Sequence, residues 1–131
     1  MSHFTKVATK INDLVSLKKA LDQLGWKYQS NEEGVVVRGY KGQTLNAEMS
    51  IDMGKYDIGV VKNEAGSYEL IADWWGIETT RGVTEEEAVK ELNAKYAYQR
   101  VLVALQDQGY QVDTNNVQAD GSVKLSVGKW E

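Results

Sequence analysis

Four strand-like segments follow one another between residues 35 and 75, and the short turns between them constrain the fold more than any other feature. The segments are rich in β-branched and aromatic residues, and glycine or asparagine stands in the turns. A parallel connection needs a crossover of a dozen or more residues, which these turns cannot supply. The sequence therefore predicts an antiparallel meander with strands at 35–40, 45–51, 56–61 and 67–75.

The two faces of this meander differ. The segment 45–51 alternates between apolar and polar residues, as in a sheet with one face on the core and the other on solvent. The neighbouring segments are less regular, because apolar residues stand on their polar side, namely Val36, Val61, Ile71 and Trp75. We therefore expect the second face to be partly covered by another chain, by a partner or by the terminal segments.

An amphipathic helix is expected on each side of the meander. Before it, leucines recur at helical spacing at positions 14, 17, 21 and 24, between a capping residue (Asn12 or Asp13) and Gly25. After it, residues 76–83 read as a loop, and a helix opens with a capping box at Thr84 and runs to about residue 108. This second helix is long for a small domain, so a kink or break near Tyr98 is expected.

Further strands are predicted outside the meander. The segment 3–10 reads as an edge strand, because Lys6 and Lys10 point the same way as Phe4. Shorter strands are expected at 26–29, 110–113 and 122–127, with a turn at 30–34.

Residues 20–28 and 104–112 read alike. In each, a helix end is followed by glycine, an aromatic residue and a short strand, then by a turn and a second strand. A true helix–strand–turn–strand repeat predicts two helices that sit alike on one continuous sheet. The alternative is that any helix-to-strand junction favours glycine followed by an aromatic residue.

Together these elements predict a single α+β domain over residues 1–131. We expect a largely antiparallel sheet of six to eight strands with two helices packed on one face. A chain of 131 residues fits one core and buries roughly 68% of its unfolded surface.

Composition excludes several classes of function. The chain has no cysteine, which excludes thiol catalysis, disulfides and cysteine-ligated zinc or iron–sulfur centres. The single histidine, His3, argues against a Ser-His-Asp triad and against a histidine-rich metal site. We therefore predict no catalytic residue, no metal and no cofactor, and the sequence favours a protein that is not an enzyme.

Charge and hydropathy limit the partners and the compartment. Residues 1–41 carry seven Lys/Arg against four Asp/Glu, but these basic residues are spread over several elements, so we do not expect nucleic acid as a partner. No apolar run approaches the roughly 20 residues that span a bilayer. The N-terminus has no signal-peptide core, so we expect a cytoplasmic protein without membrane insertion.

The segment 38–43 is the first candidate for a binding site. It lacks the glycine spacing of a phosphate loop, and a hairpin turn with mobile polar side chains is the simpler interpretation. Four of its side chains could still bind an anion or an acidic partner loop together, namely Arg38, Tyr40, Lys41 and Gln43.

Carboxylates on the polar face of the meander are the second candidate. On a concave face they could perform acid–base chemistry or hold a divalent cation, whereas on a flat face they would be solvated, with Arg38 offsetting their charge. The residues concerned are Glu48, Asp57, Glu69 and Asp73. Beyond them, Trp74 and Trp75 are expected on opposite faces of one strand, one in the core and the other at an interface.

Several segments of the chain resemble a known family. They are Met1–Val7, Leu17–Gly25, Val37–Gln43, Tyr56–Gly59 and Lys129–Trp130. Over nearly its whole length the chain resembles hypothetical chloroplast open reading frame thirty-five, a family of cyanobacterial and algal plastid genomes with a domain of unknown function. The resemblance implies a cytoplasmic or plastid-stromal setting in a photosynthetic lineage, and no activity, cofactor or catalytic residue.

These observations favour a non-enzymatic protein-binding or assembly module, with a protein partner or self-association. The alternative is a small-ligand or anion-binding protein, conceivably an enzyme, that uses the polar face of the sheet. The residues expected to bind ligand or partner are Arg38, Tyr40, Lys41, Gln43, Glu48, Asp73 and Trp75.

Overall fold

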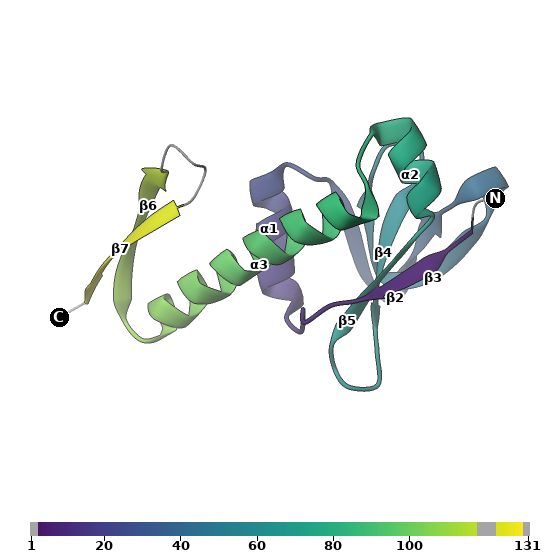
Figure 1. The fold of residues 1–131 in the computed structure, drawn as a ribbon. Coiled ribbons are helices and arrows are strands. Elements are labelled where there is room, and N and C mark those ends of the chain that lie inside the picture. The colour runs from purple at the N-terminus through teal and green to yellow at the C-terminus, as the bar shows by residue number, and fades with distance from the viewer. Residues whose placement is uncertain (1–2, 118–122, 130–131) are drawn as a thin grey trace.

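The computed structural model describes residues 3–117 and 123–129, with side chains for residues 3–111 (Figure 1). Five strands form one antiparallel sheet in the order β1-β5-β4-β3-β2. These strands are β1 Thr5–Ala8, β2 Tyr28–Arg38, β3 Thr44–Asp52, β4 Asp57–Lys62 and β5 Tyr68–Ala72. The helices are α1 Leu14–Leu24, α2 Trp74–Arg81 and α3 Glu85–Asp107, with a 3₁₀ turn at Tyr40–Gly42. The α+β class and the antiparallel meander are thus confirmed.

The predicted sheet of six to eight strands is wrong. The last two strands, β6 Tyr110–Val117 and β7 Val123–Lys129, pair with each other as a separate two-stranded sheet. The reason is the length of α3, which continues through Tyr98 without the expected break for 23 residues, or about 35 Å. Figure 1 shows that its C-terminal half extends past the five-stranded sheet and holds the hairpin apart from it.

The predicted helix count is also wrong, because α2 occupies part of the expected strand 67–75 and of the expected loop. The strand ends at Ala72, and the Asp73 side chain accepts a hydrogen bond from the Gly76 amide at 3.1 Å as the N-cap of α2. A tryptophan pair has high β propensity, which masked the helix start in the sequence. The two tryptophans therefore do not lie on opposite faces of a strand.

Strand β2 is longer than predicted. The expected strand 26–29, turn 30–34 and strand from 35 form one strand, whose pairing with β3 shifts register between Ser30 and Val35. The polar run between these residues is accommodated as an irregularity in the ladder rather than as a turn.

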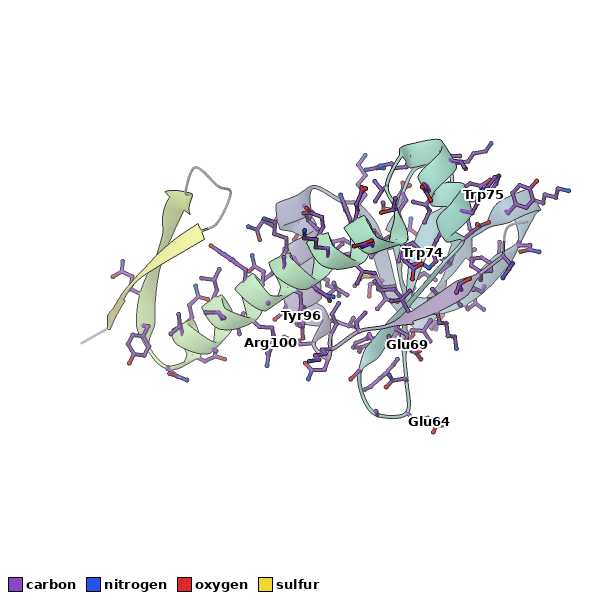
Figure 2. The ribbon with its side chains drawn as sticks, in the orientation of Figure 1. Glu64, Glu69, Trp74, Trp75, Tyr96 and Arg100 are labelled. Carbon is purple, nitrogen blue, oxygen red and sulfur yellow. The ribbon has the colours of Figure 1, made fainter. Side chains whose placement is uncertain are left out.

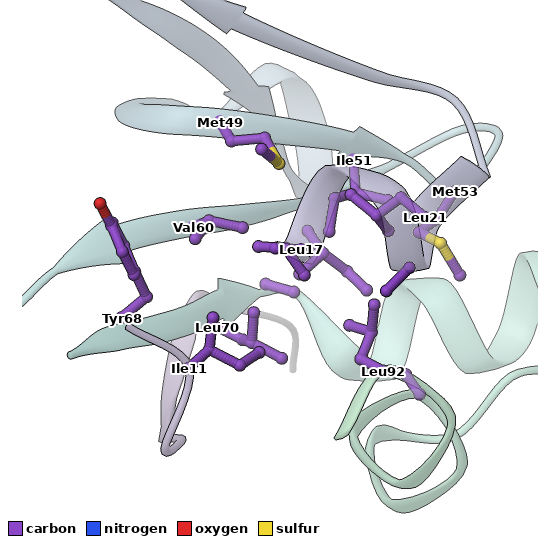
Figure 3. Packing of buried hydrophobic residues seen from close by; sticks show 14 of the residues in the cluster. Ile11, Leu17, Leu21, Met49, Ile51, Met53, Val60, Tyr68, Leu70 and Leu92 are labelled. Atoms are coloured by element: carbon purple, nitrogen blue, oxygen red, sulfur yellow. The ribbon is translucent and has the colours of Figure 1, made fainter. Parts of the chain in front are cut away.

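The core lies between one face of the sheet and the helices (Figure 3). The predicted leucine stripe of α1 is confirmed at its centre, where Leu17 and Leu21 are fully buried. Both helix starts follow the sequence: Asp13 accepts from the Val15 amide in α1, and Thr84 accepts from the Glu87 amide in α3. Leu92 of α3 belongs to the same buried cluster as these two leucines.

The second face of the sheet is packed locally by β2 itself. A Cβ on Gly59 of β4 would stand 2.8 Å from Val37 Cγ2 and 2.9 Å from Ile71 Cγ2. Val37 and Ala47 are buried, and neither belongs to the main core. The β2–β3 hairpin therefore covers part of this face. The sequence had left open whether another chain, a partner or the terminal segments would cover it.

Of the predicted helix–strand–turn–strand repeat only the helix end with its glycine recurs, because residues 30–38, expected as a turn and a second strand, continue β2 instead. Gly25 after α1 and Gly109 after α3 both adopt positive φ, at 74° and 85°, and each leads into an antiparallel hairpin with a register shift. The predicted common sheet is wrong, because the first hairpin belongs to the five-stranded sheet and the second does not.

Candidate functional site

The connection between β2 and β3 is a tight turn built around the 3₁₀ segment. The Gly39 amide donates to the Gln43 carbonyl at 2.7 Å, and the Gln43 amide donates to the Tyr40 carbonyl at 3.1 Å. Between them Lys41 has φ 54° and ψ 38°, and it is the one non-glycine residue with positive φ in the described part of the chain. This left-handed conformation costs a lysine roughly 1–2 kcal/mol, so neighbouring contacts must hold it in place.

Arg38 has an internal partner. Its Nε and Nη2 atoms donate to the two carboxylate oxygens of Asp57 at 2.9 and 2.7 Å, a bidentate pair. Nη2 also donates to Asp52 Oδ1 at 3.1 Å and to the Gly54 carbonyl at 2.9 Å. Hydrogen bonding to Asp57 raises the pKa of Arg38, and the Asp57 side chain is almost wholly buried. The positive charge of Arg38 is therefore largely offset within the chain.

An aromatic cluster lies beside the turn. The Tyr40 and Trp75 rings are 6.2 Å apart and meet edge to face at 86°, and Lys41 Nζ stands 5.5 Å from the centre of the Tyr40 ring. Trp75 remains 54% exposed, whereas its neighbour Trp74 is 7% exposed. Figure 2 shows Trp75 on the outer side of α2 and Trp74 turned toward the sheet. We call Tyr40, Lys41 and Trp75 the aromatic cluster.

A shallow groove of about 430 Å³ adjoins the cluster. It is lined by residues 38–44 together with Lys55 and Tyr56. Lys41, Gln43 and Lys55 are exposed at its rim. The structure therefore brings together four of the seven predicted site residues, Arg38, Tyr40, Lys41 and Gln43, and places Trp75 against Tyr40.

The two carboxylates among the seven predicted site residues, Glu48 and Asp73, serve other roles. Glu48 accepts a hydrogen bond from the Lys62 amide at 3.2 Å, away from the groove. Asp73 is 1% exposed and caps α2, and its second oxygen, Oδ2, is buried without a hydrogen-bond partner among the described residues. Among the side chains that the structure describes, those of residues 3–111, no three Asp, Glu or His converge as metal ligands would.

Lys55 and Tyr56 also line this groove, although neither is among the predicted site residues. The Tyr56 ring packs so closely on α2 that a Cβ on Gly76 would stand 2.7 Å from its Cε2 atom. This contact fixes the first turn of α2, and with it Trp75, against the β3–β4 turn. A glycine inside a helix costs about 1 kcal/mol, so Gly76 was the signal in the sequence that another group approaches there.

In the described part of the chain, no helix combines the length and apolar character that crossing a membrane requires.

Comparison with known proteins gives a family but no activity. A family model described as a protein of unknown function (DUF1257) matches residues 20–126. The uncharacterized protein ycf35 of Guillardia theta is 33% identical over 99% of this chain and 98% of its own length. The uncharacterized protein ycf35 of Cyanophora paradoxa is 34% identical over the same shares of the two chains. No solved structure is significantly similar to this chain.

Proposed function

The chain belongs to the DUF1257 family of proteins of unknown function, with ycf35 relatives in plastid-bearing lineages, and we propose that it is a protein-binding module. The aromatic cluster engages the partner. The observation that carries this proposal is the half-exposed Trp75, whose ring meets the Tyr40 ring edge to face. Exposed tryptophan is enriched among the residues that dominate binding energy at interfaces.

The charges around the cluster indicate an acidic partner segment. Lys41 and Lys55 both line the groove and are exposed, whereas Arg38 is offset by Asp57 and Asp52. Neither of these two lysines forms an ion pair with an acidic side chain in the part of the chain that the structure describes. An acidic segment that carries an apolar side chain would match both the lysines and the Trp75 ring.

The conformation of Lys41 supports the same proposal. Left-handed backbone at a non-glycine residue is retained where it positions a functional group, and here it places the ammonium group over the Tyr40 ring. Replacing Lys41 by glycine relieves the backbone cost. It is therefore expected to preserve or raise stability while weakening partner binding.

The groove supports a second candidate function, the binding of a small anion. Its volume of about 430 Å³ falls in the range of small-molecule sites, and Lys41, Lys55 and Gln43 could contact an anion there. Because the Arg38 donors are engaged by Asp57, this function would depend on the two lysines. Phosphate and nucleotides should then raise the melting temperature of the wild type but not of a Lys41→Ala/Lys55→Ala double variant.

Pull-down from native lysate with four forms of the chain tests the binding module. Wild type and the control Val101→Ala, which truncates an exposed apolar residue on α3, should retain the same stoichiometric partner. Trp75→Ala should weaken that partner at least tenfold, and Lys41→Glu should weaken it through charge repulsion.

Cross-linking then identifies the segment of the partner that lies on the cluster. We expect that segment to be acidic. Equal capture by wild type and Trp75→Ala, or a monomer that captures nothing, would refute the proposal.

A further inference from the structure

Strand β1 is an open edge of the five-stranded sheet. Among the described strands only β5 pairs with it, in register from Thr5 opposite Ala72 to Ala8 opposite Glu69. An open edge presents backbone donors and acceptors that can pair with another chain. Helix α3 lies alongside this strand, and two hollows separate them.

The two hollows follow one stripe of α3. The first, of about 470 Å³, lies between Val7 of β1 and Glu85, Glu86 and Val89 of α3. The second, of about 730 Å³, lies between residues 8–11 and Tyr96, Ala97 and Arg100. Figure 2 shows Tyr96 and Arg100 on the side of α3 that faces this segment. From residue 86 to residue 100 the helix rises about 21 Å, which an extended peptide covers with about six residues.

Hydrogen bonds hold the two walls of this groove in place. The Tyr96 hydroxyl accepts from the Asn12 and Asp13 amides, each at 3.1 Å, and donates to Asn12 Oδ1 at 3.0 Å. Thr9 Oγ1 donates to the Tyr68 carbonyl at 2.6 Å, which ties the segment after β1 to the sheet. The groove is therefore formed before any partner arrives, so binding would cost little reorganisation.

We infer that the groove between β1 and α3 binds an extended peptide of a partner protein, which adds to the open edge of β1 as a sixth strand. Strand addition beside a helix combines backbone pairing with pockets for alternate side chains. The apolar floor provides such pockets, with Val7 and Val89 in one hollow and Ile11 and Ala97 in the other. Alternate residues of the peptide that face this floor are apolar.

The charges at the two ends of the groove define the peptide further. Lys10 and Arg100 stand at one end, where Asp13 offsets part of the Arg100 charge through an ion pair of 3.4 Å. Glu85, Glu86 and Lys90 line the other end, which therefore carries a net charge of −1. A peptide antiparallel to β1 begins at the Lys10 end. It therefore carries an acidic residue toward its N-terminus and a basic residue toward its C-terminus, with apolar residues between.

Selection from a randomised twelve-residue peptide display library on the full chain tests this inference. Enriched peptides should carry, over about six residues, an acidic residue, then two apolar residues separated by one position, then a basic residue. Ala97→Arg fills the larger hollow and should weaken an enriched peptide at least tenfold in fluorescence polarisation. The matched control Ala94→Arg places the same side chain at an exposed position of α3 that lines neither hollow, and should bind as wild type does.

Charge exchange gives an independent readout. Lys10→Glu should weaken the enriched peptide, and a peptide with lysine in place of its acidic residue should recover binding to that variant. Trp75→Ala should leave binding unchanged, which separates this groove from the aromatic cluster. Failure of the library to enrich any peptide, or enriched peptides that bind Ala97→Arg as tightly as wild type, would overturn the inference.

Discussion

Gly59→Ala tests whether β2 packs the second face of the sheet. The added methyl group would stand 2.8 Å from Val37 Cγ2, 2.9 Å from Ile71 Cγ2 and 3.4 Å from Ala47 Cβ. Carbon atoms separate optimally by about 3.5–4.0 Å, and two of these neighbours are stiff β-branched side chains that cannot rotate away. Overpacking of this kind costs about 1–3 kcal/mol, while alanine gains about 0.5–1 kcal/mol over glycine in a strand. We expect a net loss of about 1–2 kcal/mol.

A second substitution identifies the cause of that loss. Val37→Ala alone removes buried methyl groups and should destabilise by roughly 2 kcal/mol. In the Gly59→Ala/Val37→Ala double variant, the new methyl group occupies space that the valine has left. The loss should therefore be smaller than the sum of the single losses by about 1 kcal/mol, since the two residues are in contact.

Urea unfolding followed by tryptophan fluorescence measures these values, with the midpoint compared at constant m-value. A loss of 1 kcal/mol should also lower the melting temperature by roughly 3–6 °C for a chain of this size. A Gly59→Ala variant as stable as wild type, or a fully additive double variant, would show that β2 does not pack on Gly59.

Three further predictions concern single polar groups. Tyr96→Phe should cost about 1–3 kcal/mol in urea unfolding, because the amides of Asn12 and Asp13 lose their buried acceptor; an unchanged midpoint would show that water replaces the hydroxyl. Asp73→Ala should cost about 1 kcal/mol through loss of the α2 cap, whereas Asp73→Asn keeps an oxygen for the cap and should cost less; equal losses would contradict the capping role. The Ser16 hydroxyl, at 2.6 Å, holds the pKa of Asp13 below its usual range, so this stabilisation is present above about pH 4 and is lost as pH falls below that; in acid titrations Asp13→Asn should flatten the decline, and an unchanged profile would count against it.

Local patterns in the sequence predicted much of the fold. The caps at Asp13 and Thr84 and the glycine after α1 depend on residues within a few positions of one another. Such signals need no distant contact, so they could be read correctly. The same holds for the strand-forming composition that defined the meander.

The aromatic cluster was predicted only as separate parts. Tyr40 and Trp75 were both candidates, but their contact depends on α2, which the strand propensity of the tryptophan pair concealed. Arg38 was a candidate both for binding an anion and for offsetting the carboxylates of this face, and in the structure it pairs with Asp57. The carboxylates Glu48 and Asp73 were grouped because strand residues alternate between the two faces of a sheet. Asp73 lies beyond the end of β5, at the start of α2, so this alternation does not apply to it.

The sequence by itself determined the element types, their caps and the antiparallel meander, because short-range sterics and hydrogen bonding decide these. Only the tertiary structure decided where the strands meet. The count of five strands in the main sheet depends on α3 remaining unbroken, and the covering of the second face depends on β2 approaching Gly59. Both depend on packing between residues far apart in the chain, which local propensity does not specify.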